Sequence, residues 1–561
     1  MRRPSRRTFI KGIGAASAAG LIGTNAMAAE SADDGESDWP ISDGTVGGTN
    51  FTTGAGPSPY ADRAWRTDRL PRDPAGVTVV DGTMYLAMST SEPNNSKGAI
   101  AAYDTDSGEQ LWKRDHEDEI GEVFAAPTFH DGTLYIPTAC AEQATYEMGP
   151  DPEVGGLFAL DAETGEINWQ FKMGAYWDGR ALVHDGAVYA VTDTEDSLYA
   201  VDAETGTERW KKSSEDAGID SPVLAGDTLY TTTRDEVMAL SPDGTVQWTV
   251  DRPDGASGGI VATEDLLYIS EVFAETADAD KVWALSPEDG SVVWEAETTV
   301  ESESGQPTAN TDPTVGDGLV FVSAYNNGGE YNTLNAFDAK TGEQQWTFST
   351  HVENFIPPRP TMRVSATEDT VYVGTKQETK DPSASTNAIP TVYALDAESG
   401  EEQWSYAVSE GHGNLNAGRC VPVDDRLYVT LTDFSNGRLA DSKGWVEVFK
   451  SSQTTPDAAH IPVDHFSEKE DITATITSDP QDAENKDFDS GTTVTLSGEQ
   501  STSENGAITT FEWDIDGDGE YEKTGESVAV ELDYCGILEL TLRVTDEAGK
   551  RDTETIRLST V

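Results

Sequence analysis

Ala159-Leu-Asp-Ala-Glu-Thr-Gly-Glu-Ile-Asn-Trp169 decides how this chain of 561 residues folds, because close copies of it recur along most of the sequence. Clear copies end at Trp210, Trp294, Trp346 and Trp404, and weaker ones end at Trp112 and Trp248. A second string, an acidic or Gly turn before an apolar strand, keeps the same spacing, as in Asp131-Gly-Thr-Leu-Tyr135, and occurs eight times. A repeat of about fifty residues is typical of a four-stranded propeller blade.

Each repeat predicts four strands, with the second repeat as the example. Residues 127–130 begin the first strand, residues 133–138 form the second, residues 157–161 form the third, and the fourth ends on Trp169. The turn before the fourth strand places an Asp that can accept backbone hydrogen bonds and a Gly that can take a positive φ. An indole at the strand end can bury about 150–250 Å² between adjacent blades. We expect this packing role for Trp65, Trp112, Trp169, Trp210, Trp248, Trp294, Trp346 and Trp404.

Ring closure follows from counting, because eight turns between first and second strands are matched by only seven complete tryptophan motifs. Trp445–Phe449 alternates like a third strand with no Trp after it, and Ala64-Trp65-Arg66 reads as a fourth strand with nothing before it. Pairing these two strands removes the exposed edges of an open sheet. The sequence therefore predicts an all-β fold with an eight-bladed propeller over residues 60–450, closed by its N- and C-terminal strands.

These strings closely resemble the tryptophan-docking repeats of the pyrroloquinoline quinone (PQQ) family of propellers, whose motif is Ala-x-Asp-x-x-Thr-Gly-x-x-x-Trp. The resemblance covers residues 60–450 and implies the propeller fold. It leaves the function open, since the family holds quinoprotein alcohol and glucose dehydrogenases as well as non-catalytic relatives, such as the propeller of the bacterial outer-membrane assembly machinery.

The N-terminal residues are typical of a twin-arginine export signal. Ser5-Arg6-Arg7-Thr8-Phe9-Ile10-Lys11 precedes a Gly/Ala-rich stretch and the small-residue site Ala26-Met27-Ala28. The apolar stretch is too short and too rich in Gly to span a bilayer. We therefore expect residues 1–28 to be cleaved, residues 29–59 to form a disordered acidic segment, and the protein to work outside the cytoplasm, secreted or associated with the cell surface, without a transmembrane segment.

A second domain follows a polar linker at residues 451–470. Alternating segments in residues 471–561 predict a small immunoglobulin-like sandwich, and Phe511-Glu-Trp-Asp514 with Leu542-Arg-Val-Thr-Asp546 resembles a PKD domain. In that family such modules are non-catalytic spacers or binders. Asp514, Asp516 and Asp518 stand at alternate positions before a Gly, which resembles the first half of a calcium loop, although Glu526 is one place too far for the closing ligand. The alternative is an ordinary Asp-Gly turn of the module. The predicted strands are residues 492–496, 509–514, 528–532 and 538–545.

Acidic residues outnumber basic ones 102 to 37, and the net charge of −65 is spread over the whole chain. Nucleic acid is excluded as a partner, because its phosphates would be repelled. A distributed carboxylate surface with few Lys resembles proteins of the haloarchaeal type, in which high salt screens self-repulsion; a specific acidic patch for a cationic ligand is the alternative. Cys140, Cys420 and Cys535 are too few and too dispersed for a disulfide framework.

The first strand of every repeat lines the channel of a propeller, so the aligned copies predict what a ligand on the axis would meet. Three arginines at one level, in a chain this poor in basic residues, favour a carboxylate ligand. The alternative is that they bond neighbouring strands or Asp312 and fill the channel. The candidate ligand-binding residues are Arg180, Arg363, Arg419 and Asp312; the same level holds Gly76, Ala126, Ser221 and Gly259.

The family resemblance makes PQQ and calcium candidate cofactors, since PQQ carries three carboxylates and sits at the channel mouth in the dehydrogenases. This sequence lacks the vicinal Cys-Cys pair of the alcohol dehydrogenases and has no recognisable calcium or catalytic-Asp motif. We therefore expect no cofactor and no catalytic residue, and a monomeric, secreted, non-catalytic binding or scaffold protein. Its loop-rich face would bind an extracellular protein or a small anionic ligand. The alternatives are a PQQ- and calcium-dependent alcohol or sugar dehydrogenase and a glycan-binding surface protein.

Overall fold

The computed structural model describes residues 38–560 with internal gaps, and the strands below lie in the described part. The gaps are residues 69, 71–73, 90–97, 115–119, 139–155, 174–178, 193–195, 215–217, 272–280, 300–307, 327–330, 352–361, 379–387, 408–414, 434–442, 454–471, 482, 484–485, 489–490, 504–505, 516–520, 533–535 and 548–550. The predicted export signal, Cys140, Cys535, Asp516, Asp518 and nearly all of the predicted linker therefore lie outside the described residues. No helix in the described part has the length and apolar character needed to cross a bilayer.

The described residues between 60 and 452 form eight antiparallel sheets, numbered here along the chain. Sheet 1 contains β2 (Pro74–Val80), β3 (Thr83–Ser89), β4 (Gly98–Asp104) and β5 (Gln110–Arg114); sheet 2 contains β6 (Thr128–His130), β7 (Thr133–Thr138), β8 (Gly156–Asp161) and β9 (Ile167–Phe171). Sheet 3 contains β10 (Leu182–His184), β11 (Ala187–Thr192), β12 (Ser197–Asp202) and β13 (Glu208–Ser213); sheet 4 contains β14 (Val223–Ala225), β15 (Thr228–Thr232), β16 (Glu236–Leu240) and β17 (Val246–Asp251).

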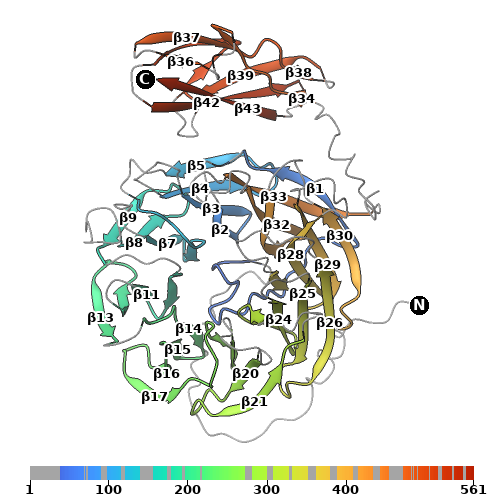
Figure 1. Ribbon diagram of the computed structural model, residues 1–561. Coiled ribbons are helices and arrows are strands. Elements are labelled where there is room, and N and C mark those ends of the chain that lie inside the picture. Colours follow the sequence, from blue (N-terminus) through green and yellow to red (C-terminus); the bar gives the residue numbers. More distant parts are fainter. Residues whose placement is uncertain are drawn as a thin grey trace, which may run out of the picture. The chain divides into compact units, whose positions relative to one another are not determined.

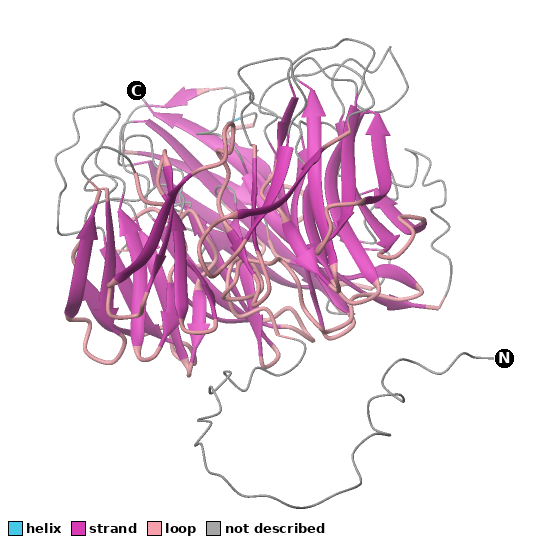
Figure 2. Ribbon diagram, turned by 90° about the horizontal axis from the view of Figure 1, so that it is seen from below, coloured by secondary structure: helices cyan, strands magenta, loops and turns pink. Residues whose placement is uncertain are grey.

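The other four sheets follow the same path. Sheet 5 contains β18 (Val261–Ala262), β19 (Leu267–Ser270), β20 (Lys281–Leu285) and β21 (Val292–Glu297); sheet 6 contains β22 (Thr308–Asn310), β23 (Thr314–Gly316), β24 (Leu319–Asn326), β25 (Tyr331–Asp338) and β26 (Gln344–His351). Sheet 7 contains β27 (Arg363–Ala366), β28 (Thr370–Glu378), β29 (Ala388–Asp396) and β30 (Glu402–Ala407); sheet 8 contains β31 (Leu415–Val423), β32 (Arg426–Asp433), β33 (Lys443–Ser452) and, from the N-terminal end, β1 (Tyr60–Arg66). The sheets stand side by side around a common axis, with the first strand of each on the inside (Figure 1) and the strands running through the thickness of the ring (Figure 2).

The repeated turn explains the repeated sequence. In sheet 2 the Asp161 carboxylate accepts hydrogen bonds from the backbone N–H and the hydroxyl of Thr164, both at 2.8 Å. Gly165 has a φ of 71°, and a Cβ there would lie 2.6 Å from the Trp112 ring of the preceding sheet. The Gly is therefore required twice, for the left-handed backbone and for the close approach of the indole.

The tryptophans connect each sheet to the next, as predicted. The Trp169 Nε1–H donates to the carbonyl oxygen of Ala203 in sheet 3 at 3.0 Å, and the ring centroid of Trp169 lies 5.9 Å from that of Tyr135 in its own sheet. The second repeated string thus supplies the aromatic partner of the first. The same indole bond joins Trp65 to Thr105, Trp112 to Ala162, Trp210 to Pro242, Trp248 to Pro287, Trp294 to Ala339, Trp346 to Ala397 and Trp404 to Pro57.

The chain ends meet in sheet 8, as the two half-repeats predicted. β1 pairs antiparallel with β33, with Trp65 opposite Val448. The Trp65 ring packs edge-on against Tyr428 of β32, with 6.5 Å between the centroids. The N-terminal strand therefore takes the outer place that a fourth strand holds in the other sheets.

The segment before β1 differs from the expectation of disorder over residues 29–59. Its described part, residues 38–59, is ordered, and Trp39 and Ile41 are buried. We call residues 38–58 the strap; it is the dark-blue loop inside the ring in Figure 1. Its polar, Gly-rich sequence makes backbone hydrogen bonds to the inner strands instead of to a neighbouring repeat, which is why no periodicity marks it.

The strap bonds to one inner strand after another. Trp39 and Val79 of sheet 1 exchange two backbone hydrogen bonds, at 2.8 and 3.0 Å. Six later carbonyl oxygens of the strap each accept a hydrogen bond from a backbone N–H, at 2.7–2.9 Å. The donors lie in the inner strands or, for Asp425, in the turn that follows one. The acceptor and donor pairs are Pro40 and Phe129, Val46 and Leu224, Gly47 and Ala262, Thr49 and Val315, Asn50 and Ala366, and Ala55 and Asp425.

The C-terminal domain is a β-sandwich around the buried Trp513. One sheet has the order β36-β43-β42-β39-β40, a second has the order β35-β37-β41, and β34 pairs with β38. The four predicted strands are present within one or two residues. The bounds are β34 (Ile472–Thr473), β35 (Thr477–Asp479), β36 (Asp487–Phe488), β37 (Thr492–Ser497), β38 (Thr502–Ser503), β39 (Ile508–Asp514), β40 (Lys523–Thr524), β41 (Ser527–Leu532), β42 (Gly536–Asp546) and β43 (Arg551–Thr560).

Candidate functional site

The aligned channel residues lie next to one another around the ring. The backbone N–H of Arg180 donates to the Ser221 hydroxyl at 3.3 Å, and that of Gly259 donates to the Asp312 carboxylate at 2.8 Å. Arg180, Ser221 and Gly259 lie just before the first strands of sheets 3, 4 and 5, and Asp312 lies just before β23 of sheet 6. These two bonds therefore bring together two neighbouring pairs of the aligned positions.

Asp43 of the strap joins two of the predicted arginines. One carboxylate oxygen contacts Nη1 of Arg180, and the other contacts Nη1 of Arg419. Arg419 Nη1 also donates to the carbonyl oxygen of Ser42 at 2.6 Å. The side chains of Arg180, Arg419 and Asp43 are 15%, 26% and 13% exposed, so this is a largely buried ion-pair triad. Arg363, the third predicted arginine, is exposed.

Burial and the nearby charge of Arg419 lower the pKa of Arg180 to about 10, while Asp312 opposes the shift. The Arg180 guanidinium group therefore stays charged at neutral pH. Asp43 does not pair with every donor of Arg180. The Nε atom of Arg180 is buried and has no hydrogen-bond partner among the described residues. The strap also packs closely on this side chain, since a Cβ on Gly48 would lie 3.0 Å from Arg180 Nη2. The strap thus fits around the guanidinium group without satisfying all its donors.

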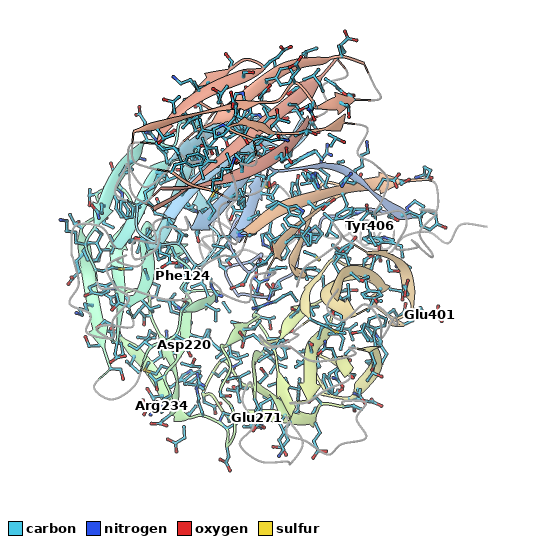
Figure 3. All side chains as sticks on the ribbon, turned by 45° about the horizontal axis from the view of Figure 1, so that its top comes forward. Phe124, Asp220, Arg234, Glu271, Glu401 and Tyr406 are labelled. Carbon is cyan, nitrogen blue, oxygen red and sulfur yellow. The ribbon has the colours of Figure 1, made fainter. Side chains whose placement is uncertain are left out.

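Arg252 forms a second ion pair that sequence reasoning missed. Its Nη2 lies 3.0 Å from Asp220 Oδ2, which also accepts a hydrogen bond from the Thr232 hydroxyl, and its Nη1 donates to the Ala256 carbonyl oxygen at 3.4 Å. Arg252 is 7% exposed and Asp220 is 50% exposed. This pair ties the loop after β17 to the start of sheet 4. Asp220 is labelled in Figure 3.

Glu271, also labelled in Figure 3, lies under the same loop. A Cβ on Gly255 would meet its carboxyl group at 3.2 Å, and burial raises the pKa of that carboxyl. Asp220 lies before β14 of sheet 4, and Glu271 directly follows β19 of the adjacent sheet 5. Both residues lie outside the two repeated strings, so the alignment gave no signal for them.

The predicted calcium loop is only partly described. Asp514 is 4% exposed at the end of β39, whereas Asp516 and Asp518 lie outside the described residues. The Ile515 N–H donates to Glu522 Oε2 at 3.0 Å, so the carboxylate of Glu522 already bonds the backbone next to Asp514. In the described part of the chain, no three His, Cys, Asp or Glu side chains are grouped closely enough to hold a metal ion.

Comparisons with known proteins agree with both predicted domains. A family model described as outer membrane protein assembly factor BamB, of the PQQ-like repeat type, matches residues 153–406 and 306–440, and a PKD domain model matches residues 478–560.

Among curated proteins, the chain is 26% identical to a polyvinylalcohol dehydrogenase of Sphingopyxis sp. over 293 residues, which are 45% of this chain and 42% of that protein. It is 24% identical to a polyvinylalcohol dehydrogenase of a Pseudomonas species, over 45% of this chain and 51% of that protein. It is 26% identical to the outer membrane protein assembly factor BamB of Yersinia pestis, over 38% of this chain and 57% of that protein. The chain thus spans about half the length of the curated relatives it matches.

Two solved structures share the fold. The quinohemoprotein alcohol dehydrogenase ADHIIG of Pseudomonas putida superposes with a TM-score of 0.51 at 15% identity, over 76% of this chain and 82% of that one. The quinohemoprotein alcohol dehydrogenase of Comamonas testosteroni gives a TM-score of 0.50 at 16% identity, over 75% and 82%. At these identities the likeness concerns the fold alone.

Proposed function

Because the chain belongs to the family of PQQ-like repeat proteins described as outer membrane protein assembly factor BamB, we propose that it is a non-catalytic binding or scaffold protein. It works outside the cytoplasm, exported by the twin-arginine route and secreted or held at the cell surface. As a monomer, it uses one loop-rich face of the propeller to bind an extracellular protein, a glycan or a small anionic ligand. The PKD-like domain acts as a spacer or a second binding module.

We assign eight blades to the propeller, which gives the scaffold its rigidity. Eight sheets and eight indole bonds support this assignment, because each bond leads to the next repeat and the bond of Trp404 leads back to Pro57, before β1. A closed ring leaves no free sheet edge at the chain ends. Such a frame can hold loops of unrelated sequence in fixed positions.

The Asp43 pairing carries the non-catalytic assignment. PQQ would bring its carboxylates to charged groups on the axis, but two of the three arginines there already bind a carboxylate of the chain itself. The described residues near them also supply no group of acidic side chains for calcium. Calcium therefore has no ligand set among the described residues, and PQQ could reach these arginines only by displacing Asp43, so no catalytic step is derived through them.

A dehydrogenase is the second candidate, and one observation favours it. Two of the curated relatives are polyvinylalcohol dehydrogenases, and each match covers 45% of this chain. In this alternative the enzyme would oxidise an alcohol or sugar with PQQ, and the strap would have to leave the arginines before the cofactor entered.

The two candidates differ in a direct assay. Purified full-length chain in high salt is incubated with PQQ and calcium chloride, and quinone absorbance and dye-linked oxidation of ethanol, glucose and polyvinyl alcohol are followed, with a quinohemoprotein alcohol dehydrogenase as positive control. We expect neither a shift of quinone absorbance nor turnover. Turnover that depends on PQQ would overturn the non-catalytic assignment.

A further inference from the structure

The strap residues around Asp43 form a compact turn inside the ring. Gly44 has a φ of 78°, and its N–H donates to the Ile41 carbonyl oxygen at 2.9 Å. The Asp43 carbonyl oxygen accepts from the N–H of Thr45 at 2.9 Å and from that of Asn50 at 2.7 Å. The hydroxyl groups of Thr45 and Thr49 are 2.7 Å apart. This turn, residues 41–50, is held by its own hydrogen bonds and presents one carboxylate to the arginines.

The two arginines approach Asp43 from opposite parts of the chain. Arg180 precedes sheet 3 and Arg419 lies in sheet 8, and each meets a different oxygen of the same carboxylate. Two guanidinium groups that each contact one oxygen of a carboxylate can bind carboxylates in general, because charge attraction and a hydrogen bond act on both oxygens. Asp43 therefore occupies the place that a carboxylate ligand would take.

The match between Asp43 and this site is incomplete. Among the described residues, the buried Nε of Arg180 has no hydrogen-bond partner, and an unpaired buried donor carries a free-energy penalty. Solvent reaches Arg419, which is 26% exposed, so an anion in solution can approach the pair. Arg180 and Arg419 also bring two positive charges to the single carboxylate of Asp43, in a chain of net charge −65.

We propose that Arg180 and Arg419 form a carboxylate-binding site whose internal ligand is Asp43, and that small carboxylate anions compete with Asp43 for it. Binding of such an anion releases the turn of residues 41–50 from the arginines. An anion bound in the channel therefore loosens the strap. This inference specifies the small anionic ligand of the proposed function and rests on it for its biological role. The binding site itself depends only on the side chains of Asp43, Arg180 and Arg419.

The competition between Asp43 and an added carboxylate should lower the affinity of the wild type for that carboxylate. A ligand that binds only the molecules in which Asp43 has left the arginines shows an affinity reduced by the fraction of such molecules. Removal of the Asp43 charge removes that reduction. If at most a tenth of the molecules are open, Asp43→Asn binds carboxylates roughly tenfold more tightly or better.

The test is calorimetric titration of the full chain with acetate and with citrate, in chloride at fixed ionic strength. Asp43→Asn is expected to bind at least one of them roughly tenfold more tightly than the wild type, and Asp43→Asn/Arg419→Gln is expected to lose that gain. Asp106→Asn is the matched control, because it removes an arginine-paired carboxylate at an exposed turn, where Asp106 contacts Arg426. It should leave anion binding unchanged.

A second measurement uses the wild type alone, in case Asp43→Asn folds poorly. Limited proteolysis with N-terminal sequencing should show that citrate speeds cleavage within residues 41–50 and leaves cleavage elsewhere unchanged. Equal affinities in the wild type and Asp43→Asn, or a gain that survives Arg419→Gln, would refute the site; so would strap cleavage that ignores citrate. Dye-linked turnover with PQQ tests the non-catalytic assignment, and it is measured separately from these binding and proteolysis results.

Discussion

The indole Nε1–H of Trp404 donates to the carbonyl oxygen of Pro57 at 3.3 Å and so joins sheet 7 to the end of the strap. In the other sheets the acceptor lies in the tight turn before the fourth strand, such as Ala339 for Trp294. Sheet 8 has no such turn, because its fourth strand is β1 from the other end of the chain. Residues of the strap take the place of the missing turn, and the contacts between neighbouring repeats continue across the chain ends.

Replacement of Trp404 by Phe tests the closing bond. Phe keeps a six-membered aromatic ring but loses the donor and the five-membered part of the indole, so the free energy of unfolding should fall by at least about 1 kcal/mol. Trp294→Phe, which removes the corresponding bond to Ala339, should cost about the same. Both are measured by urea denaturation at constant high salt. A loss in Trp294→Phe without any in Trp404→Phe would mean that the ring does not depend on Pro57.

Two glycines separate the cost of backbone conformation from the cost of crowding. Gly165 and Gly132 have φ values of 71° and 73°, but only Gly165 lies against an indole, that of Trp112; a Cβ on Gly132 would meet nothing within 4 Å. Gly132→Ala should cost about 1–2 kcal/mol from the left-handed backbone alone. Gly165→Ala should cost clearly more in the same denaturation assay. Equal losses would show that the indole moves aside freely.

These results explain what the sequence could predict. The Asp-x-x-Thr-Gly-x-x-x-Trp string specifies a turn, a glycine under an indole and a tryptophan that docks on the next repeat, so each copy carries its own structural information. Counting the copies was enough to pair Trp65 with the C-terminal strands. Alignment of the inner strands also paired Arg180 with Ser221, whose hydroxyl accepts a hydrogen bond from the Arg180 N–H.

The strap and its role could not be predicted in the same way. Its backbone-to-backbone hydrogen bonds go to residues up to 370 positions distant, such as Asp425 for Ala55, and its own sequence has no repeat. Polar and Gly-rich composition indicated disorder, although Trp39 and Ile41 in it are buried. Since Asp43 lies outside every repeat, the arginine level was visible from the sequence and its internal partner was not.

The repeated turn should make stability depend on pH in the acid range. The hydroxyl of Thr205, then Arg209 and the Thr205 N–H, lower the pKa of Asp202 from 3.8 to about 2. Because the folded-state pKa is the lower one, this carboxylate contributes stability that is present above pH about 4 and lost as the pH falls toward 2. Asp202→Asn should therefore be less stable at pH 7 and lose less stability than the wild type between pH 4 and pH 2.

Denaturation curves at pH 7, 4 and 2.5 provide this comparison. Arg209→Gln serves as the partial control, since it keeps the Thr205 bonds and removes the second cause of the shift. Its acid sensitivity should lie between those of the wild type and Asp202→Asn. If the wild type and Asp202→Asn gave parallel pH profiles, Asp202 would contribute nothing to acid sensitivity.

Cys420 should report unfolding of sheet 8. Its side chain is fully buried among Leu427, Val429 and Trp445, and burial raises the pKa of its thiol. Because the thiolate is the reactive form, iodoacetamide should label Cys420 only when the sheet opens. In a Cys140→Ser/Cys535→Ser background, labelling at pH 8 should be slow in the native protein and fast in urea. Rapid native labelling would contradict the burial of this strand.

Replacement of Trp39 by Ala distinguishes an ordered strap from a disordered one. The Trp39 side chain is fully buried with Val79, Val421 and Val448, which come from sheets 1 and 8. Its loss should lower the free energy of unfolding by about 3–5 kcal/mol, as for other buried tryptophans. Val46→Ala is the matched control in the same segment, because Val46 is 43% exposed and its carbonyl bond to Leu224 is retained; it should cost well under 1 kcal/mol. If Trp39→Ala were as harmless as Val46→Ala, the strap would not be part of the folded ring, and the pairing of Asp43 with the arginines would lose its anchor.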